Sequence, residues 1–161
     1  MLVIAKFKED ISWSDGLERT IYDKSKDIPN VGREAETYLR YIVDNYDNLP
    51  NVITFCQGNP FDHVPDFLDI YKEVGFMGLD HTTYRFKDLN HPVPLPTKEI
   101  ADELGIELPD EWKFKAGAQF TLSKEMILKY NKDFYIKTRE LINKYEKAPW
   151  VLERLWVHIF K

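Results

Sequence analysis

Polar residues follow an apolar segment near the middle of the chain. Residues 52–56, VITFC, have the β-branched and aromatic composition of a strand that is buried on both faces. The polar residues that come next include Gln57, Asn59, Asp62 and His63. In open α/β sheets, ligands bind in the crevice beyond the carboxyl ends of the strands. We therefore expect these amide, carboxylate and imidazole groups to lie in a ligand-binding site.

A helix is predicted immediately before this strand. Asn30 is a good N-cap residue, because its side chain can accept a hydrogen bond from the first helical turn. Apolar residues then recur on one helical face, at Ala35, Leu39, Ile42, Val43 and Tyr46. Pro50 ends this helix, because proline cannot continue it. Residues 30–57 are thus predicted to form a helix–strand unit.

The rest of the chain is predicted to continue this alternation. Further strands are predicted at 2–7, 19–22 and 114–122, the last with Gly117 marking a bulge or a close backbone approach. Further helices are predicted at 65–74, 97–104, 123–130 and 131–145, followed by a closing helix that begins near Pro149. The proline-dense residues 91–96 are predicted to be irregular. This order predicts a single α/β domain over 1–161, with a mostly parallel sheet flanked by helices in three layers.

Composition limits the classes of function. The chain has 161 residues, of which 43% are hydrophobic, enough for one folded domain. A formal net charge of −5 opposes binding to nucleic acid. No apolar run approaches the roughly 20 residues that span a membrane, and the first residues lack the basic start of a signal peptide. Its single cysteine, Cys56, excludes an intramolecular disulfide. These features predict a soluble, cytoplasmic protein.

Several segments together resemble a family classified only as a domain of unknown function. They are VIAKFKEDISW, IYDKS, NVGREAETYLRYI, FCQGNPFDH, FKAGAQFTLSKEMI and VLERLWVHIF. Their order is similar to the layout of a compact type-A glycosyltransferase, an α/β fold that uses nucleotide sugars. The resemblance implies a nucleotide-sugar donor and a hydroxyl acceptor on a glycan.

The resemblance also implies which residues form the site. In such enzymes an acidic residue after the first strand lies near the nucleotide base, and an Asn-x-Gly helix precedes an Asp-x-Asp metal site. A Gly-Ala strand lies near the acceptor, and a later acidic residue is the base. The corresponding residues here are Glu9 or Asp10, Asn30 and Gly32, Gln57 and Asn59, Gly117 and Ala118, and Glu153. Arg33 and Arg154 are candidates for contact with the diphosphate, Arg33 because a helix N-terminus favours anions.

The chain departs from that layout at the metal position. Gln57 and Asn59 are neutral amides where two carboxylates are expected to hold Mg²⁺ or Mn²⁺. Three alternatives follow. The downstream Asp62 and His63 supply metal ligands; or no metal is used and cations stabilise the leaving group; or the site binds without reacting. The cations considered for the second alternative are Lys24, Arg33 and Arg154.

The predicted function is that of a small glycosyltransferase. Glu153, flanked by Trp150 and Trp156, is the predicted general base that deprotonates the acceptor hydroxyl, and an in-line base implies inversion at the anomeric carbon. The alternative is a non-catalytic nucleotide- or glycan-binding protein with a degenerate transferase fold. The chain is short for the enzyme fold, which favours this alternative or a homo-oligomer. In the simpler interpretation, Glu153 and Arg154 form a surface pair worth less than about 1 kcal/mol, and Glu9 and Asp10 are solvated loop charges.

Overall fold

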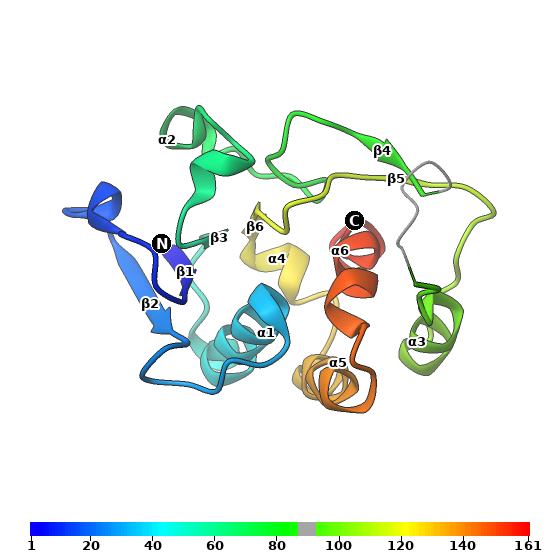
Figure 1. Cartoon of the computed structure of the whole chain (residues 1–161). Helices are drawn as coiled ribbons and strands as arrows, with labels where there is room; N and C mark the ends of the chain where they lie inside the picture. Colours follow the sequence, from blue (N-terminus) through cyan, green and yellow to red (C-terminus); the bar gives the residue numbers. More distant parts are fainter. Residues whose placement is uncertain (87–92) are drawn as a thin grey trace.

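A four-stranded sheet organises the chain (Figure 1). The computed structural model describes residues 1–86 and 93–161. Across the sheet the strands are β2 (Arg19–Asp23), β1 (Leu2–Lys6), β3 (Val52–Gln57) and β6 (Phe120–Ser123). β1 is parallel to both β2 and β3, whereas β6 is antiparallel to β3. The predicted mixed α/β fold with a mostly parallel sheet is confirmed.

The register brings the carboxyl ends of the parallel strands to one edge of the sheet. Lys6 lies opposite Asp23, and Ala5 lies opposite Gln57. Because β6 runs the other way, it begins at this edge, and the residues just before Phe120 approach it. This carboxyl edge is where open α/β sheets bind their ligands.

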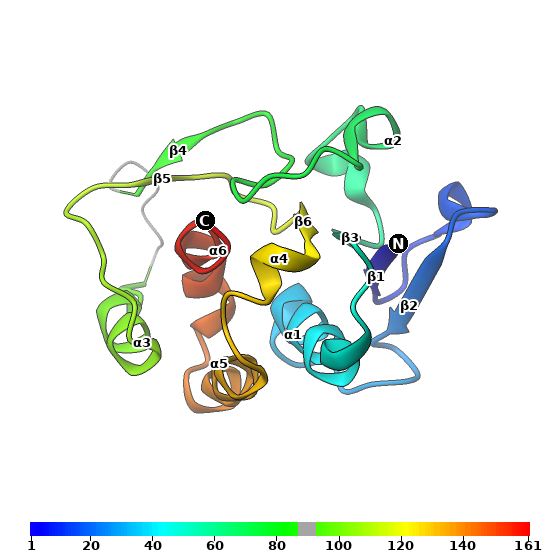
Figure 2. The same ribbon diagram turned by 180° about the vertical axis from the view of Figure 1, so that it is seen from behind.

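Three helices lie on one side of the sheet, two of them packed against its strands and the third packed against those two helices (Figures 1 and 2). They are α1 (Arg33–Asn45), α5 (Lys132–Lys144) and α6 (Ala148–Ile159). From the sheet, Val3, Phe55 and Phe120 pack into the core that these helices close. Strand side chains alternate between faces, so the neighbouring residues of β1 point to the opposite side.

A smaller core lies on the other face. It contains Leu2, Ile4 and Cys56 from the strands, with Val64 and Phe67 from the chain after β3. The short helices on this side are η1 (Ser12–Ser14), η3 (Pro60–Asp62) and α2 (Phe67–Ile70). α2 is much shorter than the predicted helix at 65–74. Both faces of the sheet are therefore covered, as the predicted three layers require.

The predicted strand at 114–122 is wrong, because two strands of different sheets occupy it. β5 (Lys113–Phe114) pairs with β4 (Tyr84–Arg85) in a separate two-stranded sheet, and β6 begins only at Phe120. The chain between them turns at Gly117, with φ +93°, and at Ala118, with φ 49°. Two consecutive left-handed residues cannot continue an extended strand, so Gly117 marks a break.

The predicted start of the first long helix is also wrong. Gly32 is the N-cap residue of α1, and its φ of 64° places it in the left-handed region. Asn30 lies two residues earlier in the exposed loop. The asparagine signal for a helix start was therefore overridden by a turn that only glycine forms without cost.

The other helix boundaries follow their local signals. Ser123 caps α4 (Lys124–Ile127) by accepting a hydrogen bond from Met126 N at 3.3 Å, although α4 is shorter than the predicted 123–130. Asn131 caps α5 in the same way. α3 (Thr97–Leu104) ends at Gly105 as predicted. The short helix η2 (Tyr46–Asn48) follows α1. Of the predicted irregular stretch, residues 91–92 lie outside the described residues, and 93–96 contain neither helix nor strand.

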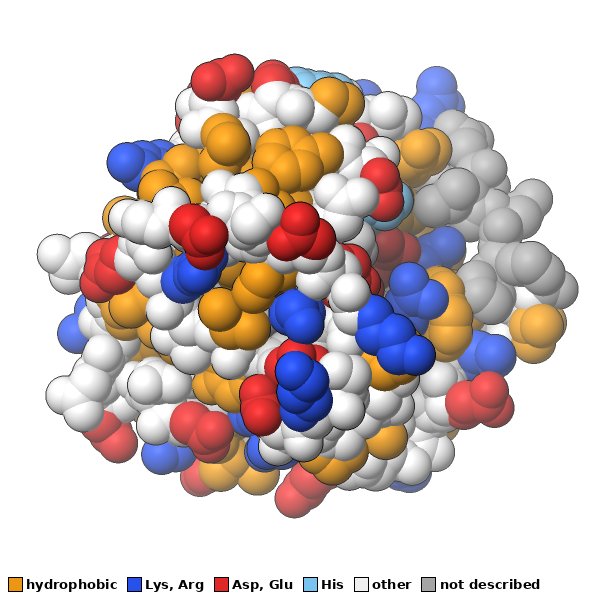
Figure 3. All heavy atoms as spheres, turned by 60° about the vertical axis from the view of Figure 1, so that its left-hand side comes forward, with side chains coloured by type: hydrophobic (Ala, Val, Ile, Leu, Met, Phe, Trp, Pro, Cys, Tyr) orange, Lys and Arg blue, Asp and Glu red, His pale blue; other side chains and the backbone are white. Residues whose placement is uncertain are grey.

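Two surface properties complete the fold. In the part of the chain that the structure describes, no helix has both the length and the hydropathy that crossing a bilayer requires. On the face drawn in Figure 3, acidic and basic side chains are interspersed among apolar ones.

Candidate functional site

A small pocket of about 110 Å³ lies at the carboxyl edge of the sheet. We call it the edge pocket. Its walls come from the start of α1, the end of β3, the chain just after β3, the turn before β6, and α6. The predicted site residues that line it are Arg33, Gln57, His63, Gly117, Ala118 and Glu153. Residues up to 120 positions apart in sequence thus share one cavity.

Gly117 joins two of these walls through its backbone. Its N–H donates a hydrogen bond to Glu153 Oε1 at 2.8 Å. Its carbonyl oxygen accepts a hydrogen bond from Gln57 Nε2 at 3.2 Å. The end of β3 and the middle of α6 therefore meet at one residue of the turn before β6. The Glu153 side chain is 20% exposed, so it is largely enclosed but still reaches the pocket.

The edge pocket also contains backbone strain. Among the described residues, Arg33 and Ala118 are the non-glycine residues with positive φ, both at 49°. Each follows a left-handed glycine, Gly32 or Gly117. A non-glycine residue in this region costs about 1–3 kcal/mol, and such residues cluster at functional sites. Both strained residues line the edge pocket, which marks it as the candidate site.

Lys24 holds the strained turn before α1. Its side chain is buried, at 7% exposure, and its Nζ donates hydrogen bonds to the carbonyl oxygens of Val31, at 2.6 Å, and of Arg33. Burial lowers the pKa of Lys24. Gly32 packs closely against α5, because a Cβ added there would lie 2.4 Å from Ile142 Cγ2. Lys24 thus serves the backbone and is outside the pocket lining.

Positive charge gathers on Trp150 at the mouth of the edge pocket. The Arg33 guanidinium lies 5.2 Å from the centre of the Trp150 ring, and Lys147 Nζ lies 5.0 Å from it. The Arg33 side chain is 55% exposed and also pairs with Glu34 at 3.5 Å. Cations over an aromatic face are stabilised by the ring quadrupole. Arg33 therefore brings a positive charge to the pocket lining, partly offset by Glu34, which lines the same pocket.

Arg154 lies outside the pocket lining. Its side chain is only 4% exposed, and its guanidinium lies 5.2 Å from the centre of the Phe114 ring. Nη1 donates to the carbonyl oxygen of Trp150 at 2.7 Å and lies 3.5 Å from Glu153 Oε2. Burial lowers the pKa of Arg154. The arginine therefore supports α6 and Glu153 from behind.

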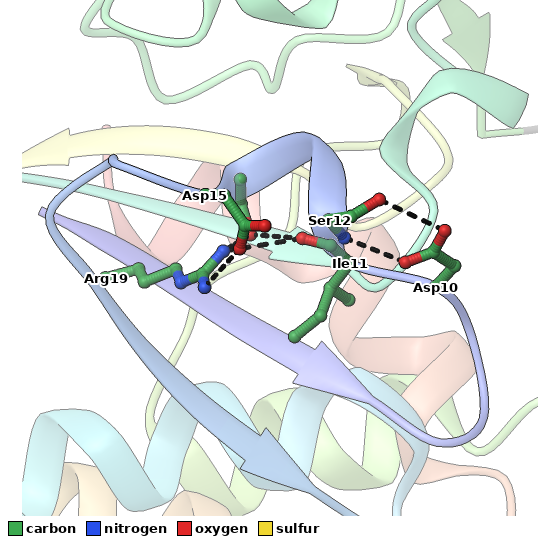
Figure 4. Close-up of polar contacts among 6 residues, drawn as sticks. Asp10, Ile11, Ser12, Asp15 and Arg19 are labelled. Atoms are coloured by element: carbon green, nitrogen blue, oxygen red, sulfur yellow. Dashed lines mark hydrogen bonds and ion pairs between the residues drawn. The ribbon is translucent and has the colours of Figure 1, made fainter.

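The acidic residues after β1, Glu9 and Asp10, accept hydrogen bonds from residues close to them in the sequence. Glu9 Oε2 accepts hydrogen bonds from the backbone N–H groups of Phe7, at 2.7 Å, and Lys8, at 3.1 Å. Asp10 accepts from the backbone N–H of Ser12 at 2.9 Å and from its hydroxyl at 3.1 Å (Figure 4). These bonds from Ser12 lower the pKa of Asp10. Burial raises the pKa of Glu9, but the backbone hydrogen bonds outweigh it and lower the pKa overall. Neither carboxylate lines the edge pocket.

Of the remaining predicted residues, some line the edge pocket and others do not. Asn30, Asn59 and Asp62 do not line the pocket. His63 does, and its Nδ1 lies 3.8 Å from Asp80 Oδ2. Sequence reasoning missed Asp80, which lies in a loop-rich stretch without a pattern that could have revealed it.

The side chains of the described residues do not form a site for a divalent metal ion. Among residues 1–86 and 93–161, no three His, Cys, Asp or Glu side chains are grouped so that they could hold one. Gln57 presents an N–H donor to Gly117, and Asp62 is exposed outside the pocket lining. Hard divalent ions require several oxygen ligands.

A larger hollow of about 910 Å³ lies beside α3. Its lining includes Leu95, Ile106 and Trp112, and it contains none of the predicted site residues. Size alone favours this hollow as a binding site. The edge pocket is the stronger candidate, because it combines converging polar groups with a strained backbone.

One comparison with known proteins gives a match, to about the first half of the chain. Residues 2–81 match the family model described as "Protein of unknown function (DUF3431)". This match covers β1 to β3 and α2, including Gln57 and Arg33, and over these residues it confirms the resemblance to a domain of unknown function. The quoted segments at 114–127 and 151–160 lie outside the match. The chain matches no curated protein and no solved structure.

Proposed function

We propose that the edge pocket transfers a sugar from a nucleotide-sugar donor to a hydroxyl group of a glycan acceptor. The observation that supports this most is the position of Glu153, held at the carboxyl edge beside Gln57 and Arg33. Three parallel strands followed by an antiparallel fourth are also compatible with the type-A layout, in which the donor lies at this edge.

The proposed reaction gives each pocket residue a task. The acceptor oxygen attacks the anomeric carbon, and the bond from that carbon to the diphosphate oxygen breaks. Glu153 takes the proton of the acceptor hydroxyl. The nucleoside diphosphate leaves with the bonding electron pair, and the Arg33 guanidinium at the pocket mouth stabilises its charge. Attack opposite the leaving group inverts the anomeric carbon.

A second candidate function is binding without transfer. The edge pocket, about 110 Å³, is smaller than the roughly 300 Å³ at which small-molecule sites begin, so it encloses one end of a nucleotide sugar at most. Both Glu153 oxygens already have partners, Gly117 N at 2.8 Å and Arg154 Nη1 at 3.5 Å. A homo-oligomer that enlarges the site stays a prediction, as does the cytoplasmic location.

A thermal-shift measurement with added ligands distinguishes a pocket that binds a nucleotide, with or without transfer, from one that binds none. A ligand that binds only the folded state raises the apparent stability. We expect UDP, GDP or their sugar conjugates to raise the melting temperature, with little effect of added Mn²⁺. Transfer is then measured by mass spectrometry of candidate acceptors. Stabilisation without transfer selects the binding function, and a flat response to every nucleotide removes both.

A further inference from the structure

Gln57 stands where the type-A layout has its first metal-binding carboxylate, yet here it acts as a hydrogen-bond donor. Its Nε2 donates to the carbonyl oxygen of Gly117 at 3.2 Å. A carbonyl oxygen is only an acceptor, and an ionised carboxylate is only an acceptor too. Aspartate or glutamate at this position would therefore repel the group that Gln57 binds.

The second polar group of Gly117 faces the proposed base. Its N–H donates to Glu153 Oε1 at 2.8 Å, a distance typical of strong bonds to an ionised acceptor. The Gln57 side chain thus holds the carbonyl group of Gly117, and the N–H group of Gly117 in turn holds the carboxylate of Glu153. Gly117 is therefore the residue to which both Gln57 and Glu153 are hydrogen-bonded.

The turn at Gly117 needs to be held in place. Ala118 has a φ of 49°, which is costly for a residue with a side chain, so this turn relaxes unless its surroundings fix it. His63 closes the third side, because a Cβ added to Gly117 would lie 3.1 Å from His63 Cγ. Gln57, Glu153 and His63 therefore confine the turn from three directions.

We propose that Gln57 is a positioning residue for Glu153. By holding the Gly117 carbonyl, it fixes the turn whose N–H orients the Glu153 carboxylate in the edge pocket. The amide at position 57 is then a requirement of this geometry and does not represent a lost metal ligand. The consequence for catalysis rests on the proposed function, whereas the chain of two hydrogen bonds does not.

The backbone amide of Gly117 reports on this chain of bonds directly. The protein has seven glycines, so selective ¹⁵N-glycine labelling gives a spectrum simple enough to assign. We expect Gln57→Glu to speed hydrogen exchange at Gly117 by about tenfold. Without the bond to its carbonyl oxygen the turn relaxes, and the Gly117 N–H then loses its own bond to Glu153 and exchanges from a more open state. The amide of Gly105, bonded at the end of α3, is the internal reference and keeps its rate.

Two further variants keep the test decisive. Asn59→Asp makes the same neutral-to-acidic change two residues away, outside the pocket lining, and should leave Gly117 unchanged. Gln57→Met keeps the size and removes the donor, so it replaces Gln57→Glu if the added charge prevents folding. Gly117 exchange equal to wild type in folded Gln57→Met overturns the proposal, as does an equal change in Asn59→Asp.

Kinetics test the catalytic consequence. If the wild type transfers sugar, Gln57→Met should lower kcat by roughly 10–100-fold, since small displacements of a catalytic group are this costly. The affinity for the nucleoside diphosphate should stay the same. Reduced affinity with unchanged kcat means that Gln57 contacts the donor, which overturns the positioning role. A wild type without transfer activity defeats the proposed function, and the exchange measurement then still decides the inference.

Discussion

The ends of β1 and β3 lie at the same edge of one sheet and both lead into polar residues, yet Gln57 lines the edge pocket whereas Glu9 and Asp10 do not. Gln57 at the end of β3 bonds to Gly117, 60 positions away in sequence. The carboxylates of Glu9 and Asp10 after β1 bond within two residues of themselves. The two ends even touch, because a Cβ added to Gly58 would lie 2.6 Å from Glu9 Oε2. A polar strand end thus becomes a site when its side chains reach across to other segments.

Two glycine turns at opposite edges of the sheet also differ in how closely they are confined. Gly16 lies just before β2, beside Met1 and Leu2, and has a φ of +79° with no atom within 4 Å of an added Cβ. At the edge pocket, Gly117 has a φ of +93° and lies against the His63 ring. The turn at Gly16 has open space around it, whereas the turn at the pocket is contacted from several sides.

Replacing Glu153, which lines the edge pocket from α6, and Glu9, which follows β1, should give the largest contrast. We expect Glu153→Gln to lower turnover by roughly 10²–10⁴-fold, the usual contribution of a general base, with nucleotide binding retained. Glu9→Gln should keep wild-type turnover, because its carboxylate only bonds to nearby backbone. Steady-state kinetics and a thermal-shift titration measure both. Equal losses in the two variants would erase the distinction between the edge pocket and the end of β1.

Glycine substitutions compare the two turns. Gly117→Ala should reduce the free energy of unfolding by about 1–3 kcal/mol or slightly more. Two costs combine, because alanine is strained at this positive φ and its Cβ would lie close to the His63 ring. Gly16→Ala meets no atom within 4 Å and should cost only the backbone strain, about 1–2 kcal/mol. Urea unfolding measures both. If Gly16→Ala costs as much as Gly117→Ala, contact with His63 adds nothing.

Cation substitutions ask whether the pocket mouth binds phosphate. Arg33→Asn removes the guanidinium while keeping a residue that tolerates positive φ. We expect roughly tenfold weaker binding of a nucleoside diphosphate, equal to about 1.4 kcal/mol. Lys8→Gln removes the same charge near the end of β1 and should leave the affinity unchanged. Isothermal titration calorimetry compares them, and equal weakening would point to long-range charge in place of a local contact.

The smallest effect concerns acid stability near β1. Hydrogen bonds from Ser12 lower the pKa of Asp10 in the folded state. Asp10 therefore stabilises the fold above its unfolded pKa, about 3.9, and this contribution is lost as the pH falls through the lower folded value. Asp10→Asn should make the free energy of unfolding fall less steeply below about pH 4. Urea unfolding between pH 3 and 7 measures the slope, and identical slopes would contradict the prediction.

Local signals in the sequence predicted much of the fold. Ser123 and Asn131 cap their helices, and Gly105 ends α3, because each acts on the residues next to it. The break inside 114–122 was missed, since its polar–apolar pattern continues through Gly117 and Ala118. The pattern does not encode the contact with His63 that shapes this turn.

The sequence predicted which residues would lie near one another better than it predicted their contacts. The order of motifs brought Gln57, Gly117 and Glu153 together, and the structure places all three around the edge pocket. Lys24 and Arg154 were considered as cations for the leaving group, but both are buried and bond to carbonyl oxygens of the protein. The sequence shows which residues carry a charge, whereas the group to which each charged side chain bonds depends on the three-dimensional arrangement.

The tight fit of Gly32 against Ile142 links the mouth of the pocket to the interior of the protein. Because α5 leaves no room for a methyl group there, the orientation of Arg33 depends on how closely α1 and α5 approach each other. Replacing Ile142, which does not line the pocket, with a smaller residue would loosen the packing of α1 against α5 and let the Arg33 side chain adopt more orientations. Under the proposed function, ligand affinity would then depend partly on hydrophobic packing, and substitutions far from the pocket would alter it.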